Sequence, residues 1–233
     1  MKTLSVVIPA FNEESTIKKI AERVLAAEIL GLSLEIIIVD DYSNDSTWEI
    51  ISSLTQKYNN ITAVRHESNL GKGAALRTGF TKALSDIVLV QDADLEYNPN
   101  DYPNLLKPIV SGKADVVYGS RFRASTETRV LYFWHRLANG LLTFLSNLFT
   151  NLNLTDMETG YKVFKKEILD KIKLKENRFG IEPEITAKIA KIDKIRIYEV
   201  GISYSGRTYE EGKKITLKDA FRAVYSIIRY NIF

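Results

Sequence analysis

The sequence predicts an α/β protein with a mostly parallel central sheet. Short runs of branched apolar residues alternate with amphipathic stretches at helical spacing through the first half of the chain. This alternation is typical of βαβ units, whose buried parallel strands are almost continuously hydrophobic. The 233 residues are enough for one large domain with a proper core.

Eight elements are expected before residue 120. The apolar runs predict strands at Leu4–Pro9, Glu35–Asp40, Ile61–Arg65, Asp86–Gln91 and Ala114–Tyr118. The amphipathic stretches predict helices at Glu14–Leu30, Ser46–Tyr58 and Gly71–Leu84. Ligands of such sheets bind beyond the carboxyl ends of the strands, so these ends are where a site is expected.

The regular alternation stops near residue 120. A polar loop at 121–128 precedes a second half with both kinds of element, which we expect to extend the same sheet within one domain. Strands are predicted at Tyr161–Phe164 and Ile195–Tyr204, and helices at Lys166–Ile172, Glu182–Ala190 and, with a basic character, Thr216–Tyr230.

A charge-free run of 19 residues, Leu137–Thr155, approaches the length of a membrane span. Its several asparagines make it too polar for one. Six apolar residues recur at helical spacing and predict an amphipathic helix instead: Leu137, Leu141, Phe144, Leu145, Leu148 and Leu152. Either this apolar face packs on its own domain, which we favour, or it lies in a lipid interface.

Composition excludes several classes of site. The chain has no cysteine, which excludes disulfides, thiolate chemistry and Cys-ligated metals, and only His66 and His135 could supply imidazole. A net charge of +3 is too small to indicate a nucleic-acid partner. The N-terminal apolar stretch is too short for a signal peptide, and a reducing, cytoplasmic location is expected.

Acidic residues gather where two predicted strands end. Asp40 and Asp41 close one strand, and the segment QDADLE follows another. In an extended segment, residues two apart point the same way, so Asp92, Asp94 and Glu96 could face one site. Converging carboxylates suit a divalent cation held between them and a phosphate. The alternative is that they cap the next helix or turn.

A glycine-containing helix start, NLGKGAALRTGF, occupies residues 69–80. Gly71 and Gly73 could let a phosphate approach the helix N-terminus. The segment matches neither the Walker A pattern nor GxGxxG. We therefore favour close packing of the helix start on the sheet.

These motifs together resemble glycosyltransferase family 2 with the GT-A fold, in particular the dolichyl- or polyprenyl-phosphate hexose synthase branch. Seven segments carry the resemblance in order: VVIPAFNEE (6–14), VDDYSNDST (39–47), NLGKGAALRTGF (69–80), QDADLE (91–96), GSRF (119–122), LTDMETGYKVFKK (154–166) and GISYSGRTYEEGKKI (201–215). The resemblance implies an inverting, metal-dependent transfer of a hexose from a nucleotide sugar, of the GDP-mannose or UDP-glucose type, to a polyprenyl or dolichyl phosphate.

The resemblance also implies residue roles. Residues 1–120 would form the nucleotide-sugar half and 121–233 the acceptor half, with its amphipathic helices. Mg²⁺ or Mn²⁺ would be held by Asp92, Asp94 and Glu96, and catalysis would depend on Asp94, Arg121 and Arg129. The expected nucleotide-sugar contacts are Pro9, Phe11, Glu13, Val39, Asp41, Asp92, Ala93, Asp94, Arg121, Arg207 and Lys213.

Two positions depart from the family pattern, and some roles stay open. Tyr42 stands where the family often has glycine, and Glu96 where dolichyl-phosphate mannose synthases often have glutamine. Glu182 and Glu184 could be a base for a hydroxyl acceptor or helix-start acids. His135 could meet the acceptor phosphate or pack in a helix, and packing is favoured for His66.

Other functions remain as alternatives. The chain could transfer sugar to a hydroxyl in cell-wall or exopolysaccharide synthesis, or bind nucleotide sugars without catalysis. Some relatives carry C-terminal membrane spans, and this sequence has none before Phe233. Peripheral contact with the cytoplasmic face of the membrane is therefore expected. The sequence makes no prediction of the oligomeric state.

Overall fold

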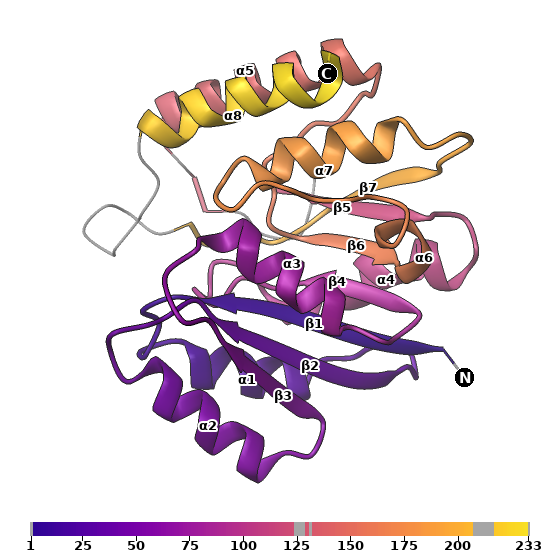
Figure 1. Cartoon of the computed structure of the whole chain (residues 1–233). Coiled ribbons are helices and arrows are strands. Elements are labelled where there is room, and N and C mark those ends of the chain that lie inside the picture. Colours follow the sequence, from indigo (N-terminus) through magenta and orange to yellow (C-terminus); the bar gives the residue numbers. More distant parts are fainter. Residues whose placement is uncertain (1, 124–128, 131, 207–216, 233) are drawn as a thin grey trace.

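The fold is built on one mixed sheet that runs through both halves of the chain. The computed structural model describes residues 2–123, 129–130, 132–206 and 217–232, with side chains from residue 220 onward in the last range. Within these residues, seven strands lie in the order β3-β2-β1-β4-β6-β5-β7 (Figure 1).

The first four strands are parallel, as expected. They are β1 (Thr3–Ala10), β2 (Ser33–Asp40), β3 (Ile61–Arg65) and β4 (Ile87–Val90). Because β1 has β2 on one side and β4 on the other, the order of the strands reverses here. Such a reversal opens a crevice at the carboxyl ends, where ligands of α/β sheets bind.

The second half continues the sheet with one reversed strand. The strands are β5 (Val116–Ser120), β6 (Lys162–Lys165) and β7 (Ile197–Gly201). β6 runs antiparallel to both β4 and β5, whereas β5 and β7 are parallel. The prediction of a mostly parallel sheet shared by both halves is confirmed.

Helices cover both faces of the sheet, each over its own apolar core. One face carries α1 (Ile17–Leu25), α2 (Thr47–Lys57) and α4 (Tyr102–Val110), the last preceded by a 3₁₀ turn at Pro99–Asp101. The other carries α3 (Lys72–Lys82), α6 (Lys166–Leu169) and α7 (Ile181–Ala190).

Two of these helices differ from the sequence prediction. α4 was not expected, because its prolines mask the helical pattern: Pro103 lies in the first turn, where proline is tolerated, but Pro108 lies inside. α1 ends at Leu25 rather than Leu30, and the chain then turns toward β2 through Leu30 and Gly31, which adopt left-handed backbone angles.

Two further helices form an outer layer beyond α7: α5 (Phe133–Thr150) and α8 (Leu217–Ile232), which lie side by side (Figure 1). The favoured interpretation of α5, that its apolar face packs on the domain, is wrong for most of that face. Leu137, Leu141, Phe144 and Leu148 are 52–67% exposed. α5 instead buries its opposite side, at Thr143 and Ser146.

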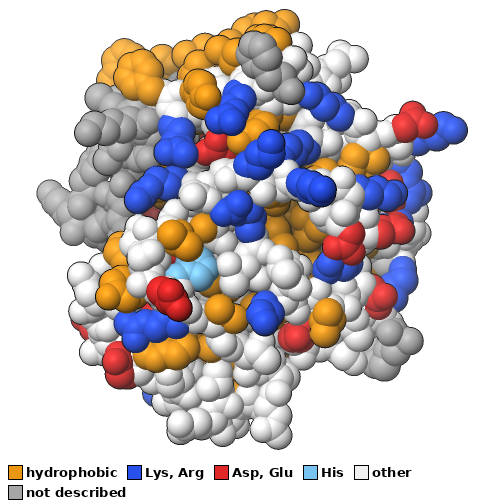
Figure 2. All heavy atoms as spheres, in the orientation of Figure 1, with side chains coloured by type: hydrophobic (Ala, Val, Ile, Leu, Met, Phe, Trp, Pro, Cys, Tyr) orange, Lys and Arg blue, Asp and Glu red, His pale blue; other side chains and the backbone are white. Residues whose placement is uncertain are grey.

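α8 has the same orientation of its apolar residues. It buries Ala223, Ser226 and Ile227, while larger apolar side chains point away from the domain. Hydrophobic side chains therefore gather over α5 and α8 in Figure 2. We call this surface the outer apolar face; its exposed members are Tyr132, Phe133, Trp134, Leu137, Leu141, Phe144, Leu148, Phe149, Phe221, Tyr225, Ile228 and Ile232. In the part of the chain that the structure describes, no helix is long and apolar enough to cross a membrane.

The start of α3 packs against the backbone of the 174–178 loop, not on the sheet as expected. A Cβ added to Gly71 or Gly73 would lie 2.5 Å from the carbonyl oxygen of Asn177 or Glu176, respectively. The Ala74 amide donates to the Asn177 carbonyl at 3.0 Å. Gly79, one turn further on, is the α3 glycine that packs on β1.

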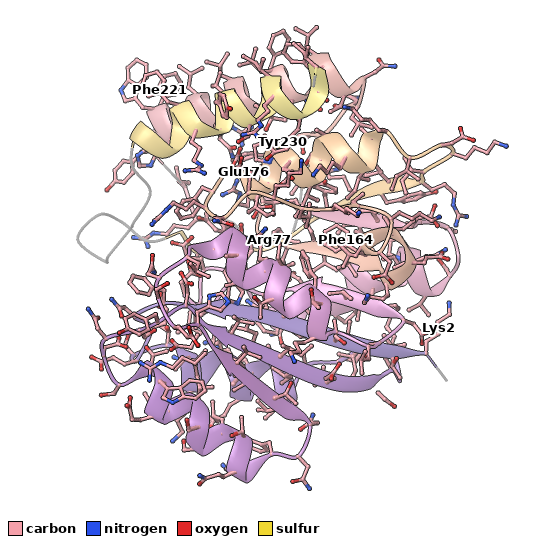
Figure 3. The ribbon with its side chains drawn as sticks, in the orientation of Figure 1. Lys2, Arg77, Phe164, Glu176, Phe221 and Tyr230 are labelled. Carbon is pink, nitrogen blue, oxygen red and sulfur yellow. The ribbon has the colours of Figure 1, made fainter. Side chains whose placement is uncertain are left out.

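The same loop also holds α8. The Glu176 carboxylate is 5% exposed and accepts hydrogen bonds from Arg222 and Tyr230 of α8, both at 3.0 Å. Arg77 of α3 reaches the loop from the other side, through the Leu174 carbonyl and the Asn177 side chain (Figure 3). The loop thus connects α3 to the outer layer.

This packing predicts that Gly73→Ala destabilises the protein although alanine favours helices. The added methyl group must displace the 176–178 backbone, which we expect to lower the free energy of unfolding by about 1–3 kcal/mol. Gly140→Ala in α5 is the matched control, since its Cβ would meet nothing within 4 Å, and should stabilise by up to about 1 kcal/mol. Urea unfolding of both variants measures the difference, and equal effects would contradict this account of Gly73.

Candidate active site

The loops after β1 and β2 are joined by side-chain hydrogen bonds. The Asn12 amide donates to the Ser43 hydroxyl at 2.9 Å, and the Asn44 amide donates to the Asn12 side chain at 3.0 Å. The Glu13 amide donates to the Thr47 hydroxyl at 2.8 Å. These bonds fix the two loops beside each other at the carboxyl ends of β1 and β2.

Five residues expected to hold the nucleoside lie along these two strand ends. Pro9 and Val39 face each other in register, but the Val39 side chain is buried in the core, so only its backbone is available to a ligand. Phe11 is 36% exposed, and Glu13 is nearly buried with a hydrogen bond from Thr16. Among the four residues other than Asp41, Phe11 has the broadest exposed surface.

Tyr42 shows why the family often has glycine at its position. Its φ is +64°, a left-handed angle that costs a residue with a Cβ roughly 1 kcal/mol. The ring is half-exposed and lies under the Arg65 guanidinium, 5.8 Å from it. This contact offsets part of the strain.

The Asp41 carboxylate, expected to contact the nucleobase, binds the loop before α3. It is almost fully buried and accepts from the amides of Leu70 and Gly71, at 3.0 and 2.7 Å, and from the Asn69 side chain at 3.0 Å. His66 pairs with the same carboxylate at 2.7 Å. Four partners occupy the ordinary capacity of a carboxylate, so in this structure Asp41 orders the 66–71 loop.

The DxD segment, residues 92–94, lies in a turn rather than in an extended strand. β4 ends at Val90, Leu95 has a left-handed φ of +64°, and the Glu96 amide donates to Asp94 Oδ1 at 3.1 Å. The expectation that every second side chain points the same way therefore does not apply beyond β4. Ala93, between the two aspartates, is buried in the core.

The three expected metal ligands have separate partners. Asp92 Oδ1 lies 2.7 Å from Lys72 Nζ, and the Glu96 carboxylate accepts from the Tyr204 hydroxyl at 2.6 Å. Among the described residues, no group of three or more His, Cys, Asp and Glu is arranged to hold a metal ion. Asp92 and Asp94 still fit Mg²⁺ or Mn²⁺, because such ions use one or two carboxylates together with substrate phosphates.

Lys72 connects the DxD segment to a buried charge cluster that is formed by Glu158, Lys162 and Glu182. Its Nζ also lies 3.6 Å from Glu182 Oε1, and Glu182 pairs through Oε2 with Lys162, which is 1% exposed. Burial lowers the pKa of the Lys72 ammonium, but the carboxylates of Asp92 and Glu182 outweigh burial and raise it above its usual value. Lys72 is therefore a charged group at neutral pH.

Glu158 adds a carboxyl group whose charge is suppressed. Burial, reinforced by Glu182, raises the pKa of Glu158 to about 7, although Lys162 and Arg121 act in the opposite direction. Its Oε1 is enclosed and has no hydrogen-bond partner among the residues that the structure describes. The cluster thus contains one carboxyl group whose pKa is raised to the neutral range.

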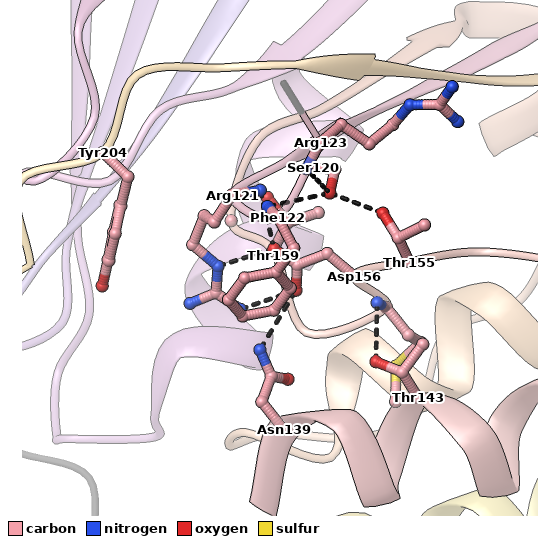
Figure 4. A network of polar contacts seen from close by, with 12 residues as sticks. Ser120, Arg121, Phe122, Arg123, Asn139, Thr143, Thr155, Asp156, Thr159 and Tyr204 are labelled. Carbon is pink, nitrogen blue, oxygen red and sulfur yellow. Dashed lines mark hydrogen bonds and ion pairs between the residues drawn. The ribbon is translucent and has the colours of Figure 1, made fainter. Parts of the chain in front are cut away.

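Arg121 is held in a fixed plane by a buried aspartate (Figure 4). Its Nε and Nη2 donate to the two oxygens of Asp156, both at 2.7 Å, and its amide donates to the same residue at 3.0 Å. Asp156 is fully buried and also accepts from Asn139 of α5 at 3.3 Å. Of the three guanidinium nitrogens, only Nη1 lies outside this pair.

The remaining expected cations are less closely placed. Arg129 is exposed; its amide donates to the Tyr204 carbonyl at 3.0 Å and its Nη1 to the Gly206 carbonyl at 2.9 Å. Arg207 and Lys213 lie outside the described residues. His135 is half-buried and stacks edge-on against Tyr132 at the start of α5.

The two open glutamates have structural partners. Glu184 is fully buried and accepts from the amides of Lys175 and Glu176, at 2.8 and 2.7 Å, and from Lys188. It therefore fixes the 174–178 loop rather than capping its own helix. Glu182 belongs to the charge cluster.

Several residues of the site were missed from the sequence. Asp156, Glu158 and Lys162 lie within the quoted segment LTDMETGYKVFKK, but no spacing rule assigns them partners. Lys72 was considered only as part of a glycine-containing helix start. Their partners are 20 to 110 residues away along the chain, so only the fold brings them together.

Comparison with known proteins agrees with this architecture. The model of glycosyl transferase family 2 matches residues 5–173. The dolichol-phosphate mannosyltransferase of Pyrococcus furiosus is 29% identical over 231 residues, covering 97% of this chain and 64% of that protein. The UDP-N-acetylglucosamine–dolichyl-phosphate N-acetylglucosaminyltransferase of Methanococcus voltae is 30% identical over 244 residues, covering 97% and 95%. The chain thus spans just under two thirds of the first relative and nearly all of the second.

A solved structure shows the same fold. Glucosyl-3-phosphoglycerate synthase of Mycobacterium tuberculosis, in complex with Mn²⁺, UDP and phosphoglyceric acid, has a TM-score of 0.75 at 21% identity, covering 99% of this chain and 79% of that one. The expected GT-A fold and the resemblance to the polyprenyl-phosphate branch are confirmed. The chain belongs to glycosyltransferase family 2 and is a glycosyltransferase of the GT-A fold.

Proposed function

We propose that the protein transfers a hexose from a nucleotide sugar to a polyprenyl phosphate, with inversion and with Mg²⁺ or Mn²⁺. The observation that carries the proposal is the position of the outer apolar face next to the candidate site. α5 presents Leu137 and Leu141 outward, while Asn139 on its inner side reaches Asp156, the partner of Arg121. A lipid tail at this face would place its phosphate close to Arg121.

Relatives support the acceptor class more firmly than the donor. Their names specify dolichyl or undecaprenyl phosphates as acceptors, but mannose, glucose, N-acetylglucosamine and an arabinose derivative as the transferred sugar. The polyprenyl phosphate is thus common to these relatives while the donor differs. GDP-mannose and UDP-glucose are the first candidate donors to be tested.

The proposed mechanism needs no general base. A phosphate monoester is ionised near neutral pH, since its second pKa is about 6. Its oxygen attacks the anomeric carbon while the bond to the nucleoside diphosphate breaks, and no proton has to leave the acceptor. Arg121, with Nη1 outside the Asp156 pair, and Arg129 would hold the acceptor phosphate, with Arg207 and Lys213 as further expected contacts.

The donor would lie across the carboxyl ends of β1, β2 and β4. Phe11 and Glu13 border the nucleoside position, and Asp92 and Asp94 would hold the divalent cation. A bound divalent cation stabilises the negative charge that develops on the leaving diphosphate. Asp41 would act by ordering the 66–71 loop, and Glu96 by holding Tyr204.

The charge balance of the site bears on this mechanism. Asp92 and Asp94 place carboxylates where the diphosphate would bind, and of these Lys72 pairs with Asp92, while Glu182 is paired with Lys162. A neutral Glu158 limits the repulsion between the protein and an anionic donor and acceptor. We therefore expect Glu158 to be protonated in much of the active enzyme.

Sugar transfer tests the proposal directly. We expect turnover of a nucleotide sugar in the presence of a polyprenyl phosphate and Mg²⁺ or Mn²⁺, in a screen of GDP-mannose, UDP-glucose and UDP-N-acetylglucosamine. Asp94→Asn should reduce it by at least about a hundredfold, because a charged ligand of the diphosphate site is lost. Asp193→Asn, at an exposed aspartate, is the control. Transfer to a polyprenol or sugar hydroxyl but not to the phosphate would contradict the proposed acceptor.

Membrane association should depend on the outer apolar face. Three of the arginines that could attract anionic lipid are paired with carboxylates, so apolar contacts should contribute much of the affinity. These pairs are Arg121 with Asp156, Arg123 with Glu199 and Arg222 with Glu176. Phe133 and Trp134 are 69% and 72% exposed. Replacing both by serine should reduce co-sedimentation with anionic vesicles at least about tenfold, since burial of each ring contributes about 1.5–3 kcal/mol.

Leu84→Ser is the matched control for the vesicle-binding experiment. Leu84 is 87% exposed but lies between α3 and β4, beside residues at the amino ends of β1 and β2. It should leave vesicle binding unchanged. Equal binding by the wild type and the Phe133–Trp134 double variant would exclude this face as the membrane contact.

Stability should depend on pH through Glu158. Since its folded pKa of about 7 exceeds the value of 4.5 that is ordinary for a glutamate, the folded state binds the extra proton between these two values. The stability contributed by this group therefore falls as pH rises through that window. Glu158→Gln removes the dependence, so its stability relative to wild type should rise between about pH 4.5 and 7 and level off above. Urea unfolding at several pH values measures it, with the exposed Glu167→Gln as control. A constant difference would show that Glu158 is not protonated in the fold.

A further inference from the structure

A chain of alternating charges leads inward from the DxD segment. Asp92 follows β4, Lys72 begins α3, Glu182 lies in the first turn of α7, and Lys162 belongs to β6. Lys72 Nζ lies 2.7 Å from Asp92 Oδ1 and 3.6 Å from Glu182 Oε1, and Lys162 pairs with Glu182 Oε2. Four separate elements therefore place these groups in contact.

The position of Lys72 is unfavourable for a cation unless carboxylates hold it. It is the first residue of α3, where the positive end of the helix dipole repels positive charge. Its side chain is only 20% exposed. The ammonium is thus held in place by Asp92 and Glu182, and it occupies the side of Asp92 that faces the charge cluster.

Glu182 offers Lys72 a second acceptor that is not fully used. Its side chain is 5% exposed, and Oε1 has no hydrogen-bond partner within the described part of the chain. A buried carboxylate oxygen without a hydrogen bond is costly and needs an explanation. Lys72 Nζ lies 3.6 Å from this oxygen, just beyond hydrogen-bonding distance.

We propose that Lys72 is a positioning residue that neutralises Asp92 while no divalent cation is bound, and moves to Glu182 Oε1 when one binds. The inference rests on the proposed role of Asp92 as a metal ligand. An ammonium and a divalent cation in contact with the same carboxylate repel each other strongly. Because Glu182 Oε1 is so close, Lys72 can release Asp92 without becoming an unpaired buried charge.

This exchange makes the cation compete with an internal ion pair. A divalent cation alone must displace Lys72 from Asp92, so its binding is weakened. A cation that arrives with a nucleoside diphosphate gains phosphate ligands and overcomes this competition. Lys72 would therefore favour binding of the cation together with the donor over binding of the cation alone.

Mn²⁺ binding without nucleotide tests the exchange, and electron paramagnetic resonance of free Mn²⁺ measures it. Lys72→Met removes the competing ammonium and should tighten binding of Mn²⁺ alone by about tenfold, the equivalent of one modest ion pair. Lys82→Met, an exposed lysine in the last turn of the same helix, should leave it unchanged.

A second variant tests the destination of Lys72. Glu182→Gln removes the charge that receives Lys72, so Lys72 stays on Asp92 and Mn²⁺ should bind several-fold more weakly than to wild type. In the Lys72→Met background the same change should have little further effect, because the two residues act through one interaction. Thermal unfolding first establishes that each variant is folded; the Lys72→Met result stands without the Glu182 variants.

The outcomes separate this inference from the proposed function. If wild type binds Mn²⁺, alone or with UDP or GDP, but Lys72→Met binds Mn²⁺ no more tightly, the exchange is wrong and the metal assignment stands. If wild type binds no Mn²⁺ under any of these conditions, the assignment of Asp92 and Asp94 fails, and the inference fails with it.

Discussion

The close approach of two backbone segments, 71–73 and 176–178, is the constraint on which the site depends. Glycine is required at both positions of the first segment because the second leaves no room for a Cβ. The contact places the start of α3, and with it Lys72, against the start of α7, and with it Glu182. The same loop binds Arg222 and Tyr230 of α8 through Glu176. The start of α3, the buried charges and the outer apolar face are therefore held by one short loop.

Much of the parallel half could be predicted from the sequence because its signals are local. Apolar runs such as EIIIVD and DIVLVQ specify buried strands, and the topology of a parallel sheet then places Asp41 and Asp92 at one edge. α4 was not predicted because Pro108 interrupts the helical pattern in the sequence. The helix forms all the same, with Leu105, Leu106 and Ile109 packed in the core. Hydrophobic periodicity identified α5 but not its orientation, since an apolar stripe is the same whether it faces a core or a membrane.

The contacts within the site were harder to predict from the sequence, because they depend on side-chain pairs that only the fold brings together. Arg121 could be recognised from its motif, but not its pairing with Asp156, 35 residues later. A lysine such as Lys162 looks like a surface residue in sequence, yet it is buried against Glu182. Asp41 was expected to face a ligand and instead orders a loop. In each case the residue can be read from the sequence, but its contacts cannot be predicted from it.

The partners of the carboxylates also bear on which acceptor the site suits. A hydroxyl acceptor needs a carboxylate that is free to take a proton. Glu184 is committed to the backbone of the 174–178 loop, and Glu182 is held by Lys162 and lies close to Lys72. Neither carboxylate is therefore free to approach a hydroxyl of the acceptor. An acceptor that arrives already ionised avoids this difficulty, and its charge would be met by Arg121, whose plane is fixed by Asp156. The arrangement of acids and bases thus favours a phosphate over a hydroxyl as the attacking group.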